Sequence, residues 1–471
     1  MAALMGIDIG TGSVKVELTD DTGQTWSASS ASYSISSLHA GWAEQDPQTW
    51  WIAAQEVVAD VWGEAGLGDD CEVNVGFTGQ MHTTVLLDSE DQPVRPAILW
   101  CDSRAHAEAK QFGEQLPSMA DITGNSPLPA FTLSHLLWLR RYEPDALDRA
   151  RSLLLPKDYL RKRLTGIGAT DWTDASGTNM LDVRTRTWSS EVMDASGLPI
   201  ELLPQVLPSH EVIGPIYNLL PDRVRAVAVT GLGDVFAEAV GAGVVESGPL
   251  IVVLGTSGAL LGVRDTPSTG VFCHAPADRW LRVDSLHSAG MSLTWLRDIV
   301  APGLSLEDLT AEAESVPAGS EGLFFLPFLA GDRSSDGGSA RAGFLGAQAR
   351  HTRAHFVRAV LEGVTMELKR IASSRMGVPH PASIVLKGGG AKSKLWAKIV
   401  ANVFAAPLSV STRSAAGGAL DVAGVGTQWW TYAEAAARAV HDTQEPSTDE
   451  MRVYAEHFDR YVEVVRSVHP D

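Results

Sequence analysis

The sequence predicts an α/β protein of two large domains, and three observations lead to this fold class. Apolar runs typical of strands alternate with amphipathic runs typical of helices along the chain. The chain has 471 residues, which is too many for a single hydrophobic core. A short glycine-rich sequence also occurs twice, at residues 6–13 and 251–258. This repeat indicates a duplicated molecule with one such element in each half.

Each repeat is an apolar run that ends in Gly-Thr and is followed by a second apolar run, which predicts a β-hairpin with a tight turn. Glycine lets backbone N–H groups approach an anion closely, and hydroxyl side chains add further donors. We therefore expect two phosphate-binding hairpins. They differ at one position, where the first has Asp8 and the second has Val253. A carboxylate beside phosphates suits Mg²⁺, so only the first hairpin is expected to hold a metal ion.

The other elements of the first half follow from cap, turn and periodicity signals. Asp46-Pro47 predicts the start of a helix whose apolar spacing continues from Trp51 to Val61. A long helical region is expected from about Leu133 through Leu160. Further strands are expected at 14–18, 73–77, 85–87 and 226–229, and a helix from Asp234 through Val240.

The second half repeats this plan after its own hairpin. Strands are expected at 323–326 and 384–386, a helix at about 352–373, and another helix opened by Gly388-Gly389-Gly390. The domain boundary is expected near 241–247, which gives domains of residues 1–245 and 246–471. No low-complexity linker separates these halves, so we expect them to pack closely around a cleft.

The composition excludes several classes of protein. The formal net charge is -20, from 37 basic and 57 acidic residues, which argues against nucleic acid or an anionic membrane as a partner. Cys71, Cys101 and Cys273 lack Cys-x-x-Cys spacing, so neither a disulfide framework nor a zinc site is expected. The N-terminus lacks the basic region of a signal peptide, and the apolar run at 250–263 is too short to span a membrane. We expect a soluble, cytoplasmic protein.

Two short segments could carry chemistry, and each has a structural alternative. Asp234 follows Gly231-Leu232-Gly233 at a strand-to-helix junction, where it could be a functional carboxylate or a plain helix N-cap. Met81-His82 follows a strand end, where loop side chains reach substrate, but a lone His is often only a structural hydrogen-bonding group.

Three other segments are weaker when each is taken alone. The run from Trp100 to Arg104 brings an aromatic ring, the Asp102 carboxylate and a guanidinium together, and its structural alternative is a surface ion pair beside a core Trp. The glycines at 388–390 could form a nucleotide-approach turn or an ordinary helix entry. Glu362 could be no more than a solvated position on a helix.

Taken together, these segments resemble the FGGY carbohydrate kinases, within the superfamily of hexokinase, actin and the heat-shock chaperone ATPases. The likeness covers nearly the whole chain and is greatest toward the bacterial xylulose kinases of that family. The resemblance implies two actin-like, ribonuclease H-like domains that flank an active-site cleft. The matching segments are 6–11, 42–47, 79–82, 96–100, 155–160, 174–178, 254–258, 325–328, 388–391 and 418–420.

The resemblance also implies roles for individual residues. It makes Asp234 the catalytic base and places Asp8 at the magnesium ion and the transferring phosphate. The residues implied as sugar contacts are Met81, His82, Trp100 and Asp102, together with Asp234. The residues implied at the nucleotide are Thr11, Gly12, Ser13 and Lys15 from the first half, and Gly255, Thr256, Gly389 and Gly390 from the second.

The chain departs from the family pattern at five places, most of them on the sugar side of the expected site. Val235 and Cys101 each stand where asparagine is usual, and His135 replaces a lysine. Residues 331–335 replace the usual Gly-Glu-Arg-Thr-Pro, and Asp421 replaces a small residue. These changes leave the phosphate-binding residues intact and bear on the identity of the sugar.

The function implied by the resemblance is ATP-dependent phosphorylation of a small sugar, with the 5-hydroxyl of D-xylulose as the expected acceptor. ATP is the expected co-substrate and Mg²⁺ the expected metal, and a homodimer is left open. Two alternatives also stay open: a kinase for another ketose, alditol or sugar acid, such as ribulose, a polyol or gluconate, and an actin-like nucleotide-switch protein. A pure switch needs no sugar-facing base, so Asp234 and Met81-His82 argue against the second alternative.

Overall fold

The computed structural model describes residues 2–68, 70–331, 340–439 and 443–469. The chain forms two compact units. The first unit contains Met1–Val245, Arg264–Leu281 and Arg413–Ala439, and the second contains Glu246–Val263, Arg282–Thr412 and Val440–Asp471. The chain therefore crosses between the units several times, and a late stretch returns to the first unit.

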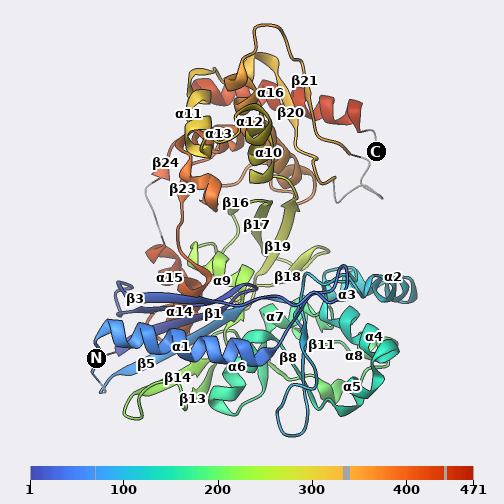
Figure 1. Cartoon of the computed structure of the whole chain (residues 1–471), viewed down its shortest axis with the longest axis vertical. Helices are drawn as coiled ribbons and strands as arrows, with labels where there is room; N and C mark the ends of the chain where they lie inside the picture. The colour runs from blue at the N-terminus through green and yellow to red at the C-terminus, as the bar shows by residue number, and fades with distance from the viewer. Residues whose placement is uncertain (1, 69, 332–339, 440–442, 470–471) are drawn as a thin grey trace. The chain divides into compact units, whose positions relative to one another are not determined.

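The first unit is built on a mixed sheet with the strand order β13-β14-β5-β1-β2-β3 (Figure 1). The central strands β1 and β5 run parallel, as do β5 and β14, while β1-β2, β2-β3 and β13-β14 are antiparallel. The strands of this sheet are β1 (Ala2–Ile9), β2 (Ser13–Thr19), β3 (Thr25–Ser32), β5 (Glu72–Gly79), β13 (Val212–Pro215) and β14 (Arg225–Val229), with the short β15 (Leu232–Gly233) also paired to β5.

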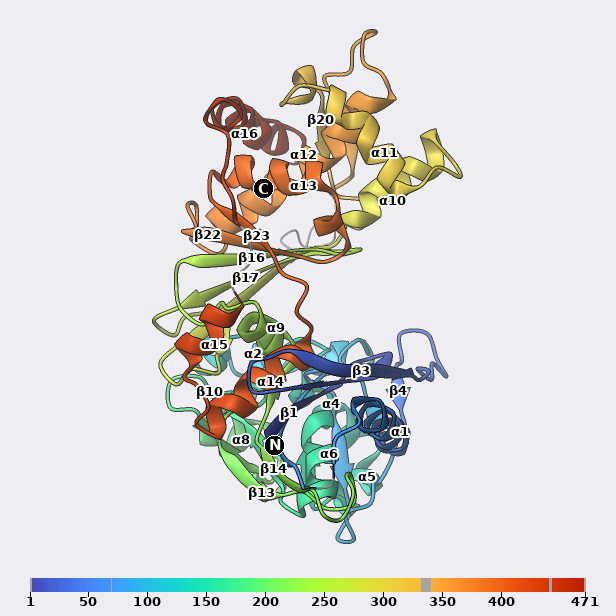
Figure 2. The same ribbon diagram turned by 90° about the vertical axis from the view of Figure 1, so that its left-hand side faces the viewer.

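The alternation of β1 places different residues on the two faces of this sheet. Met5, Ile7 and Ile9 join an apolar core with Trp50 and other residues of helix α1 (Pro47–Ala65). Gly6 and Asp8 point to the other face, where α14 (Ala415–Gly426) packs so closely that a Cβ on Gly6 would lie 2.1 Å from the Ala416 carbonyl oxygen. Figure 2 shows α1 and α14 on the two sides of these strands. Asp8 therefore lies on the same face as α14 and its neighbour α9 (Asp234–Gly241).

The predicted start of α1 is confirmed, and the long helical region expected from about Leu133 through Leu160 is divided into three helices and a short strand. Asp46 caps α1 by accepting a hydrogen bond from the Gln48 backbone N–H at 2.9 Å, and Pro47 follows it. The region after Leu133 instead contains α4, α5, β8 and α6, because Pro144 and Pro156 cannot continue a preceding helix and each begins a new one. Their bounds are α4 (Thr132–Tyr142), α5 (Pro144–Arg149), β8 (Ser152–Leu154) and α6 (Pro156–Thr165).

The rest of the first unit consists of short elements that surround the ends of the sheet. The short helix α7 (Trp172–Gly177) matters most for the site, because it follows β9 and packs beside β15. The other elements are β4 (Glu44–Gln45), β6 (Val85–Leu87), β7 (Ala97–Ile98), α2 (His106–Gln115), α3 (Met119–Thr123), β9 (Ala169–Asp171), β10 (Leu181–Asp182), β11 (Thr187–Trp188), α8 (Ser190–Ser196), β12 (Gln205–Leu207), β18 (Val271–Cys273) and α15 (Tyr432–Arg438).

The second unit repeats the hairpin-centred plan of the first. Its sheet runs β19-β17-β16-β22-β23-β24, with β16 antiparallel to β17 and parallel to β22. The strands are β16 (Pro249–Leu254), β17 (Gly258–Arg264), β19 (Trp280–Leu286), β22 (Ser383–Lys387), β23 (Leu408–Val410) and β24 (Thr443–Gln444), beside a separate pair, β20 (Phe324–Leu326) and β21 (Gly343–Leu345). The helices are α10 (Gly290–Val300), α11 (Leu306–Glu312), α12 (Arg353–Ser374), α13 (Lys394–Phe404) and α16 (Thr448–Val468).

Most element predictions for this half are confirmed, but Glu362 is not on a solvated helix face. Strands β20 and β22 and helix α12 lie where they were expected, and the glycines at 388–390 lead through a 3-10 turn into α13. The Glu362 side chain is 1% exposed and accepts hydrogen bonds from Arg358 and Tyr454. Glu362 therefore connects α12 to Tyr454 of α16 within the second unit. No helix among the described residues is long and apolar enough to cross a membrane.

Candidate functional site

The first hairpin turn, Gly10 to Ser13, is exposed to solvent at its tip and is held by hydrogen bonds from neighbouring side chains. Gly12 is exposed, and a Cβ added there would meet no atom within 4 Å. The turn closes through a hydrogen bond from the Gly10 N–H to the Ser13 carbonyl at 3.0 Å. Gln45 donates to the Thr11 carbonyl at 2.8 Å, and the Trp100 indole N–H donates to the Thr11 hydroxyl at 2.9 Å. The turn is thus a fixed loop whose outer surface is free to receive an anion.

Asp8 and Lys15 are directly paired across this hairpin. The Asp8 Oδ2 lies 3.8 Å from the Lys15 Nζ, and the Asp8 side chain is almost fully buried while Lys15 is exposed. Burial raises the pKa of Asp8 from 3.8 to about 6; Lys15 opposes this shift and Glu238 adds to it. The other oxygen, Oδ1, is buried and has no hydrogen-bond partner among the residues that the structure describes. A buried carboxylate oxygen of this kind is chemically suited to bind a cation.

The arrangement around Asp8 suits a magnesium ion that takes most of its ligands from elsewhere. Among the residues that the structure describes, no group of three or more His, Cys, Asp or Glu side chains could hold a metal ion. Mg²⁺ commonly uses one or two carboxylates and completes its shell with water and substrate phosphates. A single carboxylate such as Asp8 is compatible with an ion of this kind.

Asp234 is the first residue of α9, and the helix N-cap is Gly233 rather than Asp234. Its side chain is half-buried, and its Oδ1 accepts a hydrogen bond from the backbone N–H of the neighbouring Val235 at 2.8 Å. Burial, and then the charges of Asp8 and Asp174, raise the pKa of Asp234 well above its ordinary value. A carboxylate that is not used as a cap and has a raised pKa is suited to accept a proton.

Met81 lies against Gly233, the residue before Asp234, and both Met81 and His82 contact Gly177 at the end of α7. His82 adopts a left-handed backbone conformation with φ 63°, which is uncommon for a residue with a side chain. Its Nδ1 donates to the Gly177 carbonyl at 2.5 Å, and burial lowers its pKa to about 4. The ring is therefore neutral at neutral pH, and its Nε2 is left as an acceptor for a substrate hydroxyl. Met81 packs against Gly177 and Gly233.

The structural alternative for residues 100–104 was a surface ion pair beside a core Trp, and the structure shows the opposite burial. The ion pair is buried, with the Arg104 Nη2 2.7 Å from the Asp102 Oδ2, whereas Trp100 is 44% exposed. Asp102 also accepts the Ala43 backbone N–H at 2.6 Å, so hydrogen bonds within the protein occupy both of its oxygens. These contacts fix the loop that carries Trp100, and the exposed indole is the part of this segment available to a ligand.

Among the departures from the family pattern, Val235 is half-buried and Cys101 is exposed. His135 is fully buried, and its Nδ1 lies 2.8 Å from the Thr84 hydroxyl. Asp421 forms a buried ion pair with Arg413 at 2.9 Å. The changed residues 332–335 lie outside the described part of the chain.

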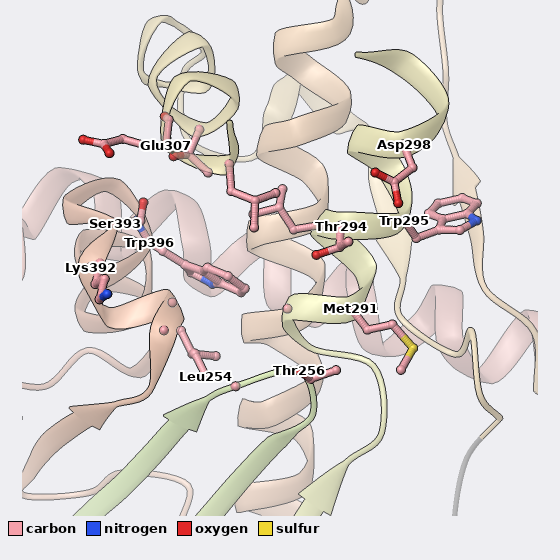
Figure 3. A pocket seen from close by; sticks show the side chains of 17 residues that line it. Leu254, Thr256, Met291, Thr294, Trp295, Asp298, Glu307, Lys392, Ser393 and Trp396 are labelled. Atoms are coloured by element: carbon pink, nitrogen blue, oxygen red, sulfur yellow. Dashed lines mark hydrogen bonds between the residues drawn. The ribbon is translucent and has the colours of Figure 1, made fainter. Parts of the chain in front are cut away.

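The second unit contains a cavity of about 1210 Å³ at the end of its hairpin. Figure 3 shows Met291, Thr294 and Trp295 of α10 on one side of the cavity, and Lys392 and Trp396 on the other. Leu254 and Thr256 lie at its strand end. Of the nucleotide residues expected here, the cavity lining includes Gly255, Thr256, Gly389 and Gly390.

Backbone contacts explain why glycine is needed around this cavity. The N–H groups of Gly290 and Met291 donate to the carbonyls of Gly255 and Thr256 at 2.9 and 3.0 Å, which ties the hairpin turn to the start of α10. A Cβ on Gly290 would lie 2.6 Å from the Gly255 oxygen. A Cβ on Gly390 would lie 2.7 Å from that of Leu254. At these glycines the cavity wall consists of backbone atoms, which a phosphate chain can approach closely.

Sequence reasoning did not single out α7 or the aromatic side chains of the cavity. Thr173, Asp174 and Gly177 contact the site through backbone and side-chain groups, and Trp295 and Trp396 line the cavity. The one available signal for Asp174 and Gly177 was their place in a segment that matches the family. Nothing in the local pattern distinguished Trp295 or Trp396 from ordinary core residues.

Comparison with known proteins identifies the family to which the chain belongs. Residues 3–241 match the N-terminal domain of the FGGY family of carbohydrate kinases, and residues 250–427 match the C-terminal domain. The chain belongs to the FGGY family of carbohydrate kinases, and it is an ATP-dependent sugar kinase with the two-domain α/β fold of that family.

Individual relatives are named for more than one sugar. The chain is 36% identical to a xylulose kinase of Escherichia coli over 89% of this chain and 88% of the relative. The crystal structure of a ligand-bound xylulose kinase from Lactobacillus acidophilus matches with a TM-score of 0.90 and 27% identity, and the match covers 100% of this chain and 99% of the other. A gluconokinase of Bacillus subtilis is 27% identical over 85% of this chain and 82% of the relative.

Proposed function

We propose that this sugar kinase transfers the terminal phosphoryl group of ATP to the 5-hydroxyl of D-xylulose. The relatives named xylulose kinase support this choice of sugar. The observation that carries the proposal is the half-buried Asp234, which is not used as a helix cap and lies in the same site as the neutral His82. This combination offers one proton acceptor and one hydrogen-bond acceptor to a polyhydroxy substrate.

In the proposed reaction, Asp234 takes the proton of the attacking hydroxyl as its oxygen bonds to phosphorus. Phosphoryl transfer depends mainly on alignment and on neutralising charge, so the other side chains have positioning and electrostatic roles. Met81, His82 and Trp100 would contact the sugar, while Lys15 and the N–H groups of Thr11, Gly12 and Ser13 would bind phosphate oxygens. Asp8 would hold Mg²⁺, which neutralises phosphate charge when it is bound.

The nucleotide would bind to the second unit, with its phosphates at Gly255 and Thr256 and its adenosine beside Gly389 and Gly390. The cavity of about 1210 Å³ is large enough for a nucleotide. We assign the sugar and metal functions to a domain of residues 1–245 and nucleotide binding to a domain of residues 246–471. A cytoplasmic location is part of the proposal, whereas a homodimer is left open.

The charges around Asp234 favour a neutral sugar over a sugar acid. The charged side chains that raise the pKa of Asp234 are the carboxylates Asp8, Asp174 and Glu238. A substrate carboxylate near these groups would be repelled, since like charges in a partly buried site interact strongly. This favours D-xylulose, ribulose or an alditol over gluconate.

A coupled assay of ADP release over a panel of pentuloses, alditols and sugar acids tests the proposal. D-Xylulose is expected to give the highest kcat/KM, with ADP and sugar phosphate formed in equal amounts. A higher kcat/KM for another sugar would replace D-xylulose, and release of ADP without sugar dependence would favour the nucleotide-switch alternative.

A further inference from the structure

Helix α7 contacts the proposed site at two places, although none of its residues has an assigned role in the reaction. The Gly233 backbone N–H, immediately before Asp234, donates to the Thr173 hydroxyl at 3.0 Å. At the other end of the helix, the Gly177 carbonyl accepts a hydrogen bond from His82 at 2.5 Å. One short helix therefore holds both the turn that carries the base and the loop that carries the sugar contacts.

The start of α7 is fixed by a buried ionic cluster. The Lys157 Nζ lies 2.7 Å from Asp158, 3.0 Å from Asp171 and 3.1 Å from Asp174, and all four side chains are at most 1% exposed. Asp171 also caps α7 by accepting the Thr173 backbone N–H at 2.9 Å. Buried ion pairs are weak evidence for stability, because desolvation opposes the attraction, and their better-attested effect is to specify one arrangement. Here that arrangement sets the position of Thr173.

Little space is left for Thr173 or Gly233 to move. The Thr173 side chain is fully buried. A Cβ on Gly233 would lie 2.8 Å from the Met81 Cγ and 3.2 Å from the Asp174 Oδ1. The residues Leu232–Gly233 are also paired with the end of β5. The turn before Asp234 is thus enclosed by β5, Met81 and α7, and the Thr173 hydroxyl accepts its N–H.

We infer that Thr173 is a positioning residue of the kinase, which sets the orientation of the Asp234 carboxylate by accepting the Gly233 N–H from a helix anchored on the Lys157 cluster. The inference rests on the proposed role of Asp234 as the base. Misplacement of a reacting group by about 1 Å can lower the rate about 100-fold, so loss of this hydrogen bond should act on catalysis more than on binding.

The chain offers a matched control on the same helix. The Ser176 hydroxyl is buried like that of Thr173; it accepts the Cys273 backbone N–H at 3.0 Å and donates to the Thr173 backbone carbonyl at 2.8 Å. Thr173→Val and Ser176→Ala therefore each leave one buried backbone N–H without its side-chain acceptor. Thr173→Ser keeps the hydroxyl and removes only a methyl group.

The experiment compares these three variants with the wild-type protein on its best sugar, measuring kcat, KM for sugar, KM for ATP and Tm. Thr173→Val should lower kcat by about tenfold to 100-fold with KM for ATP within about twofold of wild type, a range set by the positioning effect. Ser176→Ala should lower Tm by a similar amount but keep kcat within about threefold, and Thr173→Ser should restore most of kcat.

Two results would overturn the inference: a Thr173→Val kcat no lower than that of Ser176→Ala, or a Thr173→Ser variant as slow as Thr173→Val. The variant Asp234→Ala, assayed alongside, separates this inference from the proposed function. If Asp234→Ala keeps wild-type turnover, the role of Asp234 as the base fails. If only Asp234→Ala is slow, Thr173 has a structural role alone.

Discussion

The two hairpins share a backbone plan but differ in the pair of residues beside their turns. In the first, Asp8 is paired with Lys15, and in the second the matching pair is Val253 and Ala259. The first turn has four residues between its paired ends and the second has three. The second hairpin instead has a cavity at its end, with backbone groups of Gly255 and Thr256 in its wall. The same fold element can therefore present charge in one unit and bare backbone in the other.

This difference indicates a division of labour between the units. The proton acceptor and the metal ligand are proposed for the first unit, whereas the second unit is proposed to bind the nucleotide without a charged side chain beside its hairpin turn. Four predictions test that division, beginning with the largest expected effect.

Replacing Asp234 by Ala should abolish most turnover and leave nucleotide binding unchanged. General-base catalysis contributes about 10² to 10⁴-fold, so kcat should fall by at least about 100-fold. Calorimetry should give an ADP affinity within about twofold of wild type, because the cavity of the second unit is untouched. An Asp234→Ala variant with near-normal kcat would place the base elsewhere.

Asp8→Asn should raise the Mg²⁺ concentration needed for half-maximal rate by about tenfold or more, since an amide keeps the shape but loses the charge that a hard cation prefers. Titration of the rate with Mg²⁺ at saturating ATP measures this shift. Binding of Mn²⁺ in the presence of ADP, followed by electron paramagnetic resonance, should weaken in parallel. If Asp8→Asn has the wild-type rate at limiting Mg²⁺, the difference between Asp8 and Val253 does not reflect metal binding.

Gly290→Ala should act on the second hairpin alone. The added Cβ would lie 2.6 Å from the Gly255 oxygen, so the turn and the start of α10 must separate. We expect KM for ATP to rise by about tenfold while KM for sugar stays near wild type, the size expected when one buried hydrogen bond is lost. Gly63→Ala in α1 is a suitable control, because a Cβ there meets no atom within 4 Å. Equal effects of Gly290→Ala on both KM values would contradict the division.

The smallest expected effect concerns stability rather than rate. The pKa of Asp8 is raised from 3.8 to about 6 in the folded protein, so the folded state binds a proton more tightly than the unfolded state. This group therefore lowers stability as pH rises from about 4 through 6, by up to about 3 kcal/mol. In metal-free buffer, Asp8→Asn should be more stable than wild type at pH 7.5, and the difference should shrink toward pH 4.5. Chemical denaturation at both pH values measures this, and a difference independent of pH would contradict it.

Local patterns in the sequence were enough to predict both hairpins, the capped start of α1 and most strands of the two sheets. They failed where long-range contacts decide. The region after Leu133 is an exception, because the two prolines that divide it, Pro144 and Pro156, are local signals. Glu362 appears solvated unless its partner Tyr454, far along the chain, is known. The burial of Asp102 likewise depends on Ala43 and Arg104, which only the fold brings together. The role of each predicted site residue remains a proposal.

The return of residues 413–439 to the first unit has a consequence for folding during synthesis. Helix α14 covers β1 and β5, and a Cβ on Gly76 would lie 1.9 Å from the Ala419 carbonyl oxygen. On the ribosome, that helix is made only after residues 246–412, a delay of about 10–30 s at ordinary rates of translation. Until then one face of the nascent sheet has no cover. The packing of the earliest-made strands is therefore completed only when one of the last-made helices has been synthesised.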